Sequence, residues 1–157
     1  MLDKFEDIVR RAGIYTEASL AEVADRHPFI ARDIHPLLPK KVLKLFDDAH
    51  YPEATFHAAK FIDKTVARAS GLSETGATLM QKAFSEKAPQ IRLNELQNDT
   101  DQNEQKGYMS LFVGLVWAIR NPRGHEYEIG DEQSLCLDHL SFMSMLMRRL
   151  EVAQIKF

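Results

Sequence analysis

Apolar residues recur every three or four positions over most of the chain, which is the spacing of helices with one buried face. Pro39 and Pro52 suit the first turn of a helix, and Gly71 suits a helix end. The pattern predicts four main helices, over about 39–49, 52–70, 103–120 and 132–154. No stretch alternates apolar and polar residues over a useful length, so the expected fold class is all-α.

The predicted helix 52–70 has two contrasting faces. Small and apolar residues form the face suited to close packing, namely Thr55, Ala58, Ala59, Ile62, Val66 and Ala69. Polar residues line the other side, namely Glu53, His57, Lys60, Lys64 and Arg68. Such a row is usually a solvated surface, but it could also lie along a phosphate backbone. Both interpretations remain open at this point.

The predicted helix 103–120 also carries two stripes. The apolar stripe consists of Tyr108, Leu111, Phe112, Leu115 and Ile119, and the stripe of small residues consists of Gly107, Ser110, Gly114 and Ala118. Each glycine inside a helix costs about 1 kcal/mol relative to alanine. We therefore expect another helix to approach this stripe closely, either within the bundle or across a dimer.

The remaining segments complete the predicted organisation. A loop over 71–77 precedes a short helix containing Leu79, Met80, Ala83 and Phe84, and the amide-rich stretch 87–103 is expected to be a long, mobile connection. Asp131 is the expected N-cap of the last helix. The core face of that helix is expected to contain Leu135, His139, Met143, Leu146, Met147 and Leu150. Residues 1–34, with helices over 1–12 and from Ser19, form an accessory segment, and 35–157 form the main domain.

Composition narrows the class of protein. The chain has 157 residues, of which 45% are hydrophobic and 27% charged, and no apolar run long enough to cross a membrane. Without a signal-like N-terminus and with Cys136 as the single cysteine, we expect a cytoplasmic protein without an internal disulfide. The histidines lack metal-ligand spacing and no glycine-rich phosphate loop is present, so no cofactor or metal is expected. A net charge of −3 argues against general coating of nucleic acid, although a small basic site remains compatible with it.

The stretch Arg120-Asn121-Pro122-Arg123-Gly124-His125 carries the candidate chemistry. Pro122 predicts that the helix ends near Asn121, and Gly124 predicts a free turn before His125. Arg120 could then bind a phosphate of RNA while His125 transfers a proton, as metal-independent cleavage by the ribose 2′-OH requires. One histidine cannot easily act as base and acid together, so a second copy in a two-fold dimer would complete the site. The plain alternative is that Arg120 caps helix carbonyls and His125 is a polar loop residue.

A series of motifs along the chain resembles a known family. The motifs are Ile34-His35-Pro36, His50-Tyr51-Pro52-Glu53-Ala54, Ala58-Ala59-Lys60, Ser70-Gly71-Leu72, Leu79-Met80-Gln81-Lys82-Ala83-Phe84, Leu111-Phe112-Val113-Gly114 and Ala118-Ile119 followed by R-N-P-R-G-H. Together they cover about residues 34–153. The final motif resembles that of the HEPN superfamily, and the whole series is similar to the bacterial and phage "Ymh" family within it.

This resemblance implies an antiparallel four-helix bundle core that dimerises through the motif-bearing helices. It also implies a metal-independent endoribonuclease of a toxin–antitoxin, abortive-infection or phage-defence system, in which a partner antitoxin or sensor controls activity. Arg120 and His125 would be catalytic, Asn121 would hold the turn or contact the phosphate, and Asp63 or Lys60 would support them. The alternative is a non-catalytic member that binds a nucleotide, RNA or a protein partner at the same groove.

Overall fold

The computed structural model describes residues 26–125 and 130–157, and the chain divides into two units, Met1–Asp33 and Ile34–Phe157. In the first unit the short helix α3 (Pro28–Ala31) begins where the Phe29 amide donates to His27 Nδ1 at 3.1 Å. The helices expected over 1–12 and from Ser19 lie outside the described residues.

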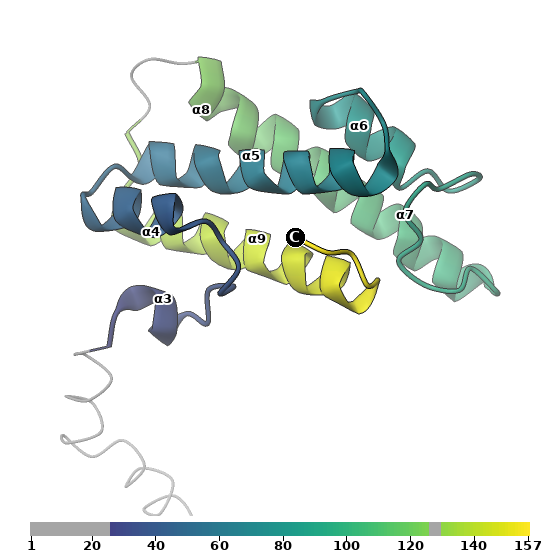
Figure 1. The fold of residues 1–157 in the computed structure, drawn as a ribbon, viewed down its shortest axis with the longest axis horizontal. Helices are drawn as coiled ribbons and strands as arrows, with labels where there is room; N and C mark the ends of the chain where they lie inside the picture. The colour runs from purple at the N-terminus through teal and green to yellow at the C-terminus, as the bar shows by residue number, and fades with distance from the viewer. Residues whose placement is uncertain (1–25, 126–129) are drawn as a thin grey trace, which may run out of the picture. The chain divides into compact units, whose positions relative to one another are not determined.

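The second unit is a bundle of helices, which confirms the all-α fold class, and its described residues contain no strand. Its elements are α4 (Lys40–Asp47), α5 (Tyr51–Ser70), α6 (Gly76–Ala83), α7 (Asp99–Gly114), the π-helix η2 (Leu115–Arg120), α8 (Asn121–His125) and α9 (Gln133–Val152). In Figure 1, α5 and α9 run in one direction and the segment from α7 to α8 runs in the other. Helix α5 is central, because it packs against α4, α6, η2, α8 and α9.

Helix α5 closely matches its prediction. Pro52 lies in its first turn, and Gly71 ends it with a left-handed φ of 69°. The predicted packing stripe is buried with the exception of Ala69, which is exposed. The small residues Thr55, Ala58 and Ala59 on this stripe let neighbouring helices approach α5 closely.

The connection between α6 and α7 differs from the prediction. Helix α7 begins at Asp99, where the Asn98 side chain caps it by accepting from the Asp101 amide at 3.0 Å. The connection is also fastened to the core through the fully buried Gln105. Its side-chain oxygen accepts from the Leu93 amide at 2.9 Å, and its nitrogen donates to the Phe84 and Ile91 carbonyls at 3.2 and 3.0 Å.

The predicted helix end at Asn121 is wrong, because helical backbone continues through Pro122 to His125. The turn before Pro122 is widened into the π-helix η2, and the Asn121 amide bonds the Val116 carbonyl five residues back. Pro122 is then the second residue of α8, a position where the missing amide hydrogen is tolerated. Gly124 is therefore part of a helix and does not form the expected free turn.

The predicted buried faces of the third and last helices are partly wrong. Phe112 and Leu115 are buried as expected, but Leu111 and Leu135 are 39% and 43% exposed. A Cβ atom added to Gly107 or Gly114 would meet nothing within 4 Å. No described helix of this chain therefore approaches the small-residue stripe, and the expected close packing within the bundle is absent.

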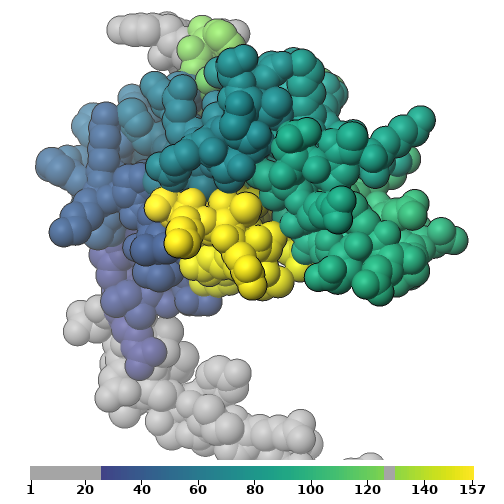
Figure 2. All heavy atoms as spheres, turned by 45° about the vertical axis from the view of Figure 1, so that its right-hand side comes forward, coloured from purple at the N-terminus to yellow at the C-terminus, as the bar shows by residue number. Residues whose placement is uncertain are grey.

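The methionines of the described helices differ in burial. Met80, Met143 and Met147 are fully buried, whereas Met145 is 40% exposed. The residues after α9 turn back along the bundle in Figure 1, and together with the end of α9 they form the yellow surface in Figure 2. There the Phe157 ring stacks on Phe61 at 6.1 Å between centroids.

Candidate functional site

Arg120, at the end of η2, is held in place but keeps spare hydrogen-bonding capacity. Its Nη1 donates to Asn121 Oδ1 at 2.9 Å, and its guanidinium carbon lies 5.8 Å from the centre of the Phe56 ring. Its Nε is buried without a hydrogen-bond partner in the described part of the chain. Asn121 thus orients the guanidinium, and the side chain retains N–H donors for an anion.

Lys60 reaches the same aromatic ring from α5. Its ammonium nitrogen lies 6.0 Å from the Phe56 centroid, so Lys60 and Arg120 share one ring. On its edge Phe56 contacts Gly124, where an added Cβ would lie only 2.9 Å from Phe56 Cε2. The glycine is needed for this close approach of α8 to α5, and the predicted residue Lys60 lies against the same ring as Arg120.

Asp63, the other predicted supporting residue, has a different place. Its side chain is buried, and its Oδ1 accepts from the Gly76 amide at 2.7 Å. Gly76 is the first residue of α6 and has a left-handed φ of 63°. In the structure, Asp63 therefore anchors the start of α6 and does not line the surface beside Arg120.

His125 is the last residue of α8, and its side chain is exposed. Residues five apart in an α-helix are separated by about 140° around the axis. In keeping with this, no hydrogen bond joins Arg120 and His125 among the interactions of the described residues. Regular helical geometry therefore predicts that the two side chains leave the segment in different directions within one chain.

A buried ion pair between Arg123 and Asp131 also holds α8 in place. Arg123 donates through Nε and Nη2 to the two oxygens of Asp131 at 2.6 and 2.7 Å, and through Nη1 to the Ile119 carbonyl at 2.8 Å. The Arg123 and Asp131 side chains are only 6% and 1% exposed. Asp131 was expected to cap the last helix, but the N-cap is Glu132, since the Asp131 carboxylate is used by Arg123.

A second histidine, His139, lies close to this ion pair. Burial lowers the pKa of His139, and the positive charge of Arg123 lowers it further. Its Nδ1 is buried and has no hydrogen-bond partner within the described segments. His139 is therefore neutral at pH 7, and it lies near the Arg123–Asp131 ion pair.

An apolar hollow of about 390 Å³ lies between the α7–η2 segment and α9. It is lined by Ser110, Leu111, Gly114, Ala118, Ile119, Leu135, Asp138, His139 and Phe142. Trp117 on η2 is also 59% exposed. Exposed large apolar side chains around an open groove are typical of a surface that binds another protein.

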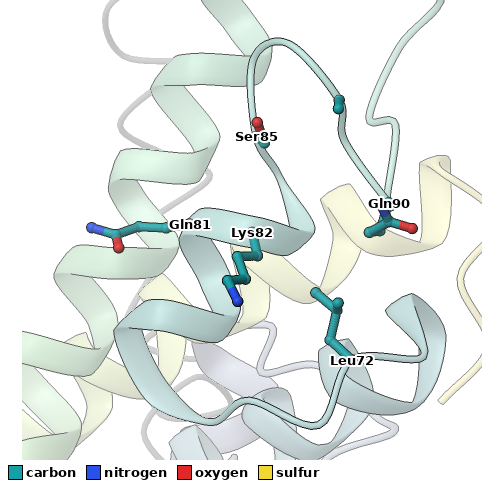
Figure 3. Close-up of a pocket in the computed structure, with 6 residues that line it drawn as sticks. Leu72, Gln81, Lys82, Ser85 and Gln90 are labelled. Atoms are coloured by element: carbon teal, nitrogen blue, oxygen red, sulfur yellow. The ribbon is translucent and has the colours of Figure 1, made fainter.

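A second hollow, of about 310 Å³, lies beside α6 and is lined by Leu72, Gln81, Lys82, Ser85, Ala88 and Gln90. Figure 3 shows that Gln81 and Gln90 point in opposite directions, so their amides do not converge on one ligand position. The Lys82 ammonium is paired with Glu74. The polar groups of this hollow therefore do not form a binding site of their own.

Two further chemical features concern the described residues alone. Among residues 26–125 and 130–157, no three His, Cys, Asp or Glu side chains come together so as to hold a metal ion. Within the same ranges, no helix has the length and apolarity needed to cross a membrane.

The structure thus defines a helical bundle with an arginine and a histidine of one R-N-P-R-G-H motif near its surface. The profile of the Hypoth_Ymh family, described as a protein of unknown function, matches residues 32–150. The chain belongs to this family, which confirms the Ymh-type resemblance. Neither the search of curated proteins nor that of solved structures gave a match.

Proposed function

We propose that this protein is a metal-independent endoribonuclease of HEPN type in which Arg120 binds the scissile phosphate and His125 transfers a proton. The observation that carries the proposal is the state of Arg120, which is half-buried and oriented by Asn121 and Phe56, and whose guanidinium makes one hydrogen bond, through Nη1, within the described residues. A fixed guanidinium with free donors suits the charge that develops on a phosphate during cleavage. Lys60 supplies a second cation at the Phe56 ring.

In the proposed reaction the ribose 2′-oxygen attacks the adjacent phosphorus while a base takes its proton. The bond from phosphorus to the 5′-oxygen breaks, and an acid supplies a proton to that oxygen. The products are a 2′,3′-cyclic phosphate and a free 5′-hydroxyl. The proposed step requires neither a metal ion nor a water molecule. An imidazole can serve as base or acid near neutral pH, and the exposed His125 is available for either role.

We further propose that the active form is a homodimer joined through the motif-bearing helices. Within one chain Arg120 and His125 diverge around the helical segment, so a second chain is needed to bring another histidine to the phosphate. The apolar hollow beside η2, with the exposed Leu111 and Leu135 in its lining, offers the surface. The open space at Gly114 leaves room for a partner helix.

The functional proposal is tested by incubating the purified protein with cellular RNA in EDTA. His125→Ala and Arg120→Ala are prepared identically, and Lys106→Gln serves as a control because this exposed lysine pairs with Glu86 away from the motif. We expect cleavage with 2′,3′-cyclic ends by wild type and Lys106→Gln, and none by the two folded motif variants. Equal behaviour of all four proteins would overturn the proposal and favour a non-catalytic binding module.

The dimer is tested separately by the molar mass in solution. Ala118→Glu places a charge in the apolar hollow, and we expect it to yield monomers that do not cut RNA. Lys106→Gln should remain dimeric. A monomeric wild type that cleaves RNA would overturn the dimer while leaving the assignment of Arg120 and His125 intact. A cell-level role in toxin–antitoxin or phage defence, with an antitoxin or sensor as partner, would follow from the HEPN resemblance.

A further inference from the structure

On α5, the Phe56 ring lies close to two cations. The ring is half-buried, and it has the guanidinium of Arg120 and the ammonium of Lys60 within 6.0 Å of its centroid. Proteins that bind unpaired nucleotides usually combine an aromatic ring with cations, because the base stacks on the ring and the cations neutralise the phosphate. The Lys60 side chain is exposed, so it can move to a phosphate and leave the ring to a base.

A row of cations continues from this ring along the exposed face of α5. Lys60, Lys64 and Arg68 follow one another at intervals of four residues, which is about 6 Å along a helix. All three are exposed, and none has an ion pair with another described residue. The row therefore differs from a helix face on which charges of alternating sign compensate one another.

Like charges four residues apart repel each other and destabilise a helix. Three other exposed lysines are paired, Lys44 with Asp48, Lys82 with Glu74 and Lys106 with Glu86. The net charge of −3 makes an uncompensated row more notable. A further cation, Lys41 of α4, is close enough to His57 to contribute, after burial and together with Lys60, to lowering the pKa of that histidine.

We infer that the exposed face of α5, from Phe56 to Arg68, binds a single strand of RNA that leads to Arg120. An unpaired base stacks on Phe56, and successive phosphates lie against Lys60, Lys64 and Arg68. This inference rests on the proposed function for its choice of RNA, and it deepens that function by naming the substrate as single-stranded. A duplex would not fit, because its bases are stacked inside the helix and cannot reach the ring.

The test measures binding rather than cleavage, so that it stays separate from the test of catalysis. The probe is a fluorescent oligouridine of about 12 nucleotides, and its anisotropy is followed in EDTA with His125→Ala protein to prevent cutting. In that background, Lys64→Gln/Arg68→Gln is compared with Lys82→Gln/Lys106→Gln, which removes the same charge from exposed lysines on α6 and α7. Each Kd is measured between about 50 and 200 mM salt.

We expect the Lys64/Arg68 variant to bind about tenfold more weakly at the lowest salt, while the control stays close to the parent. The slope of log Kd against log salt should fall by about 1.4, because each phosphate contact on a single strand contributes about 0.7. Phe56→Leu should weaken binding about fivefold or more at every salt concentration without changing the slope. Its unfolding curve identifies any loss of fold from the contact with Gly124.

Three outcomes would overturn the inference. If the parent binds and the Lys64/Arg68 variant behaves like its control, the row is a solvated face, and the assignment of Arg120 and His125 is unaffected. If a duplex of the same length binds as tightly as the single strand, the substrate class is wrong. If the parent binds no RNA, the inference fails, and the cleavage assay then decides the proposed function independently.

Discussion

Arg120 and Arg123 are three residues apart in one motif, yet the structure uses them in opposite ways. Arg123 is almost fully buried, and both its bidentate partner Asp131 and the Ile119 carbonyl occupy its donors. Arg120 is half-buried, bonds one neighbouring amide and leaves its Nε unused. The number of satisfied donors, rather than residue type or position, separates a structural arginine from one available to a ligand.

The strongest test of this comparison is the loss of the ion pair. We expect Asp131→Asn or Arg123→Ala to reduce the free energy of unfolding by about 3 to 5 kcal/mol, because each leaves a buried group without its partner. Arg120→Ala should cost about 1 kcal/mol or less, the contribution of a partly exposed cation–π contact. Urea unfolding measures all three, and an equal loss for Arg120→Ala would remove the distinction.

A smaller effect should come from the contact that positions the Arg120 side of α8. Gly124→Ala places a methyl group 2.9 Å from Phe56 Cε2, and overpacking of this kind costs about 1 to 3 kcal/mol. In a Phe56→Ala background the clash is absent, and alanine should then stabilise the helix by up to about 1 kcal/mol. A double-mutant cycle by urea unfolding measures this change of sign. The same effect of Gly124→Ala in both backgrounds would show that the ring does not hold α8.

The interior glycines of α7 give a contrasting prediction. A Cβ at Gly107 meets no atom within 4 Å, so Gly107→Ala should stabilise the monomer by about 0.5 to 1 kcal/mol. The measurement is urea unfolding at low protein concentration. A loss of stability that grows with protein concentration would instead place this glycine in an interface between copies.

How much of this could be predicted from the sequence depends on whether a feature is local. Helix α5 was predicted well because its start at Pro52, its end at Gly71 and its buried stripe all follow from neighbouring residues. The extent of the helical segment around Pro122 was predicted wrongly. Proline is a helix breaker in the interior but acceptable in a first turn, and the preceding π-turn that creates a new first turn has no sequence signal.

The candidate site shows the same limit. The motif identified Arg120 and His125, and the family resemblance suggested Lys60, which the structure places against the Phe56 ring that Arg120 also contacts. Phe56 was missed because an aromatic residue on α5 has no signal of its own until α8 is packed against it. Gln105 was missed because a buried glutamine looks like any polar residue before its three backbone partners are in place.

The smallest predicted effect is the pH dependence of stability that is due to His139, which lies near Arg123. The pKa of His139 is lowered by burial and then by Arg123, and the carboxylates of Asp131 and Asp138 only partly oppose this. As the pH falls through about 6.5, the unfolded chain takes up a proton at this histidine and the folded chain does not. Stability due to the neutral ring is therefore full above that pH and decreases below it.

Wild type should lose more stability than His139→Gln between pH 7.5 and 5.5 in urea unfolding, and the difference should be smaller than the loss caused by removing the ion pair. His57→Gln is the matched control. It removes another histidine whose pKa is lowered by burial, but one on α5 that is not acted on by Arg123. Identical pH slopes for wild type and His139→Gln would mean that water reaches His139, and the Arg123 side would then be less closed than its buried ion pair indicates.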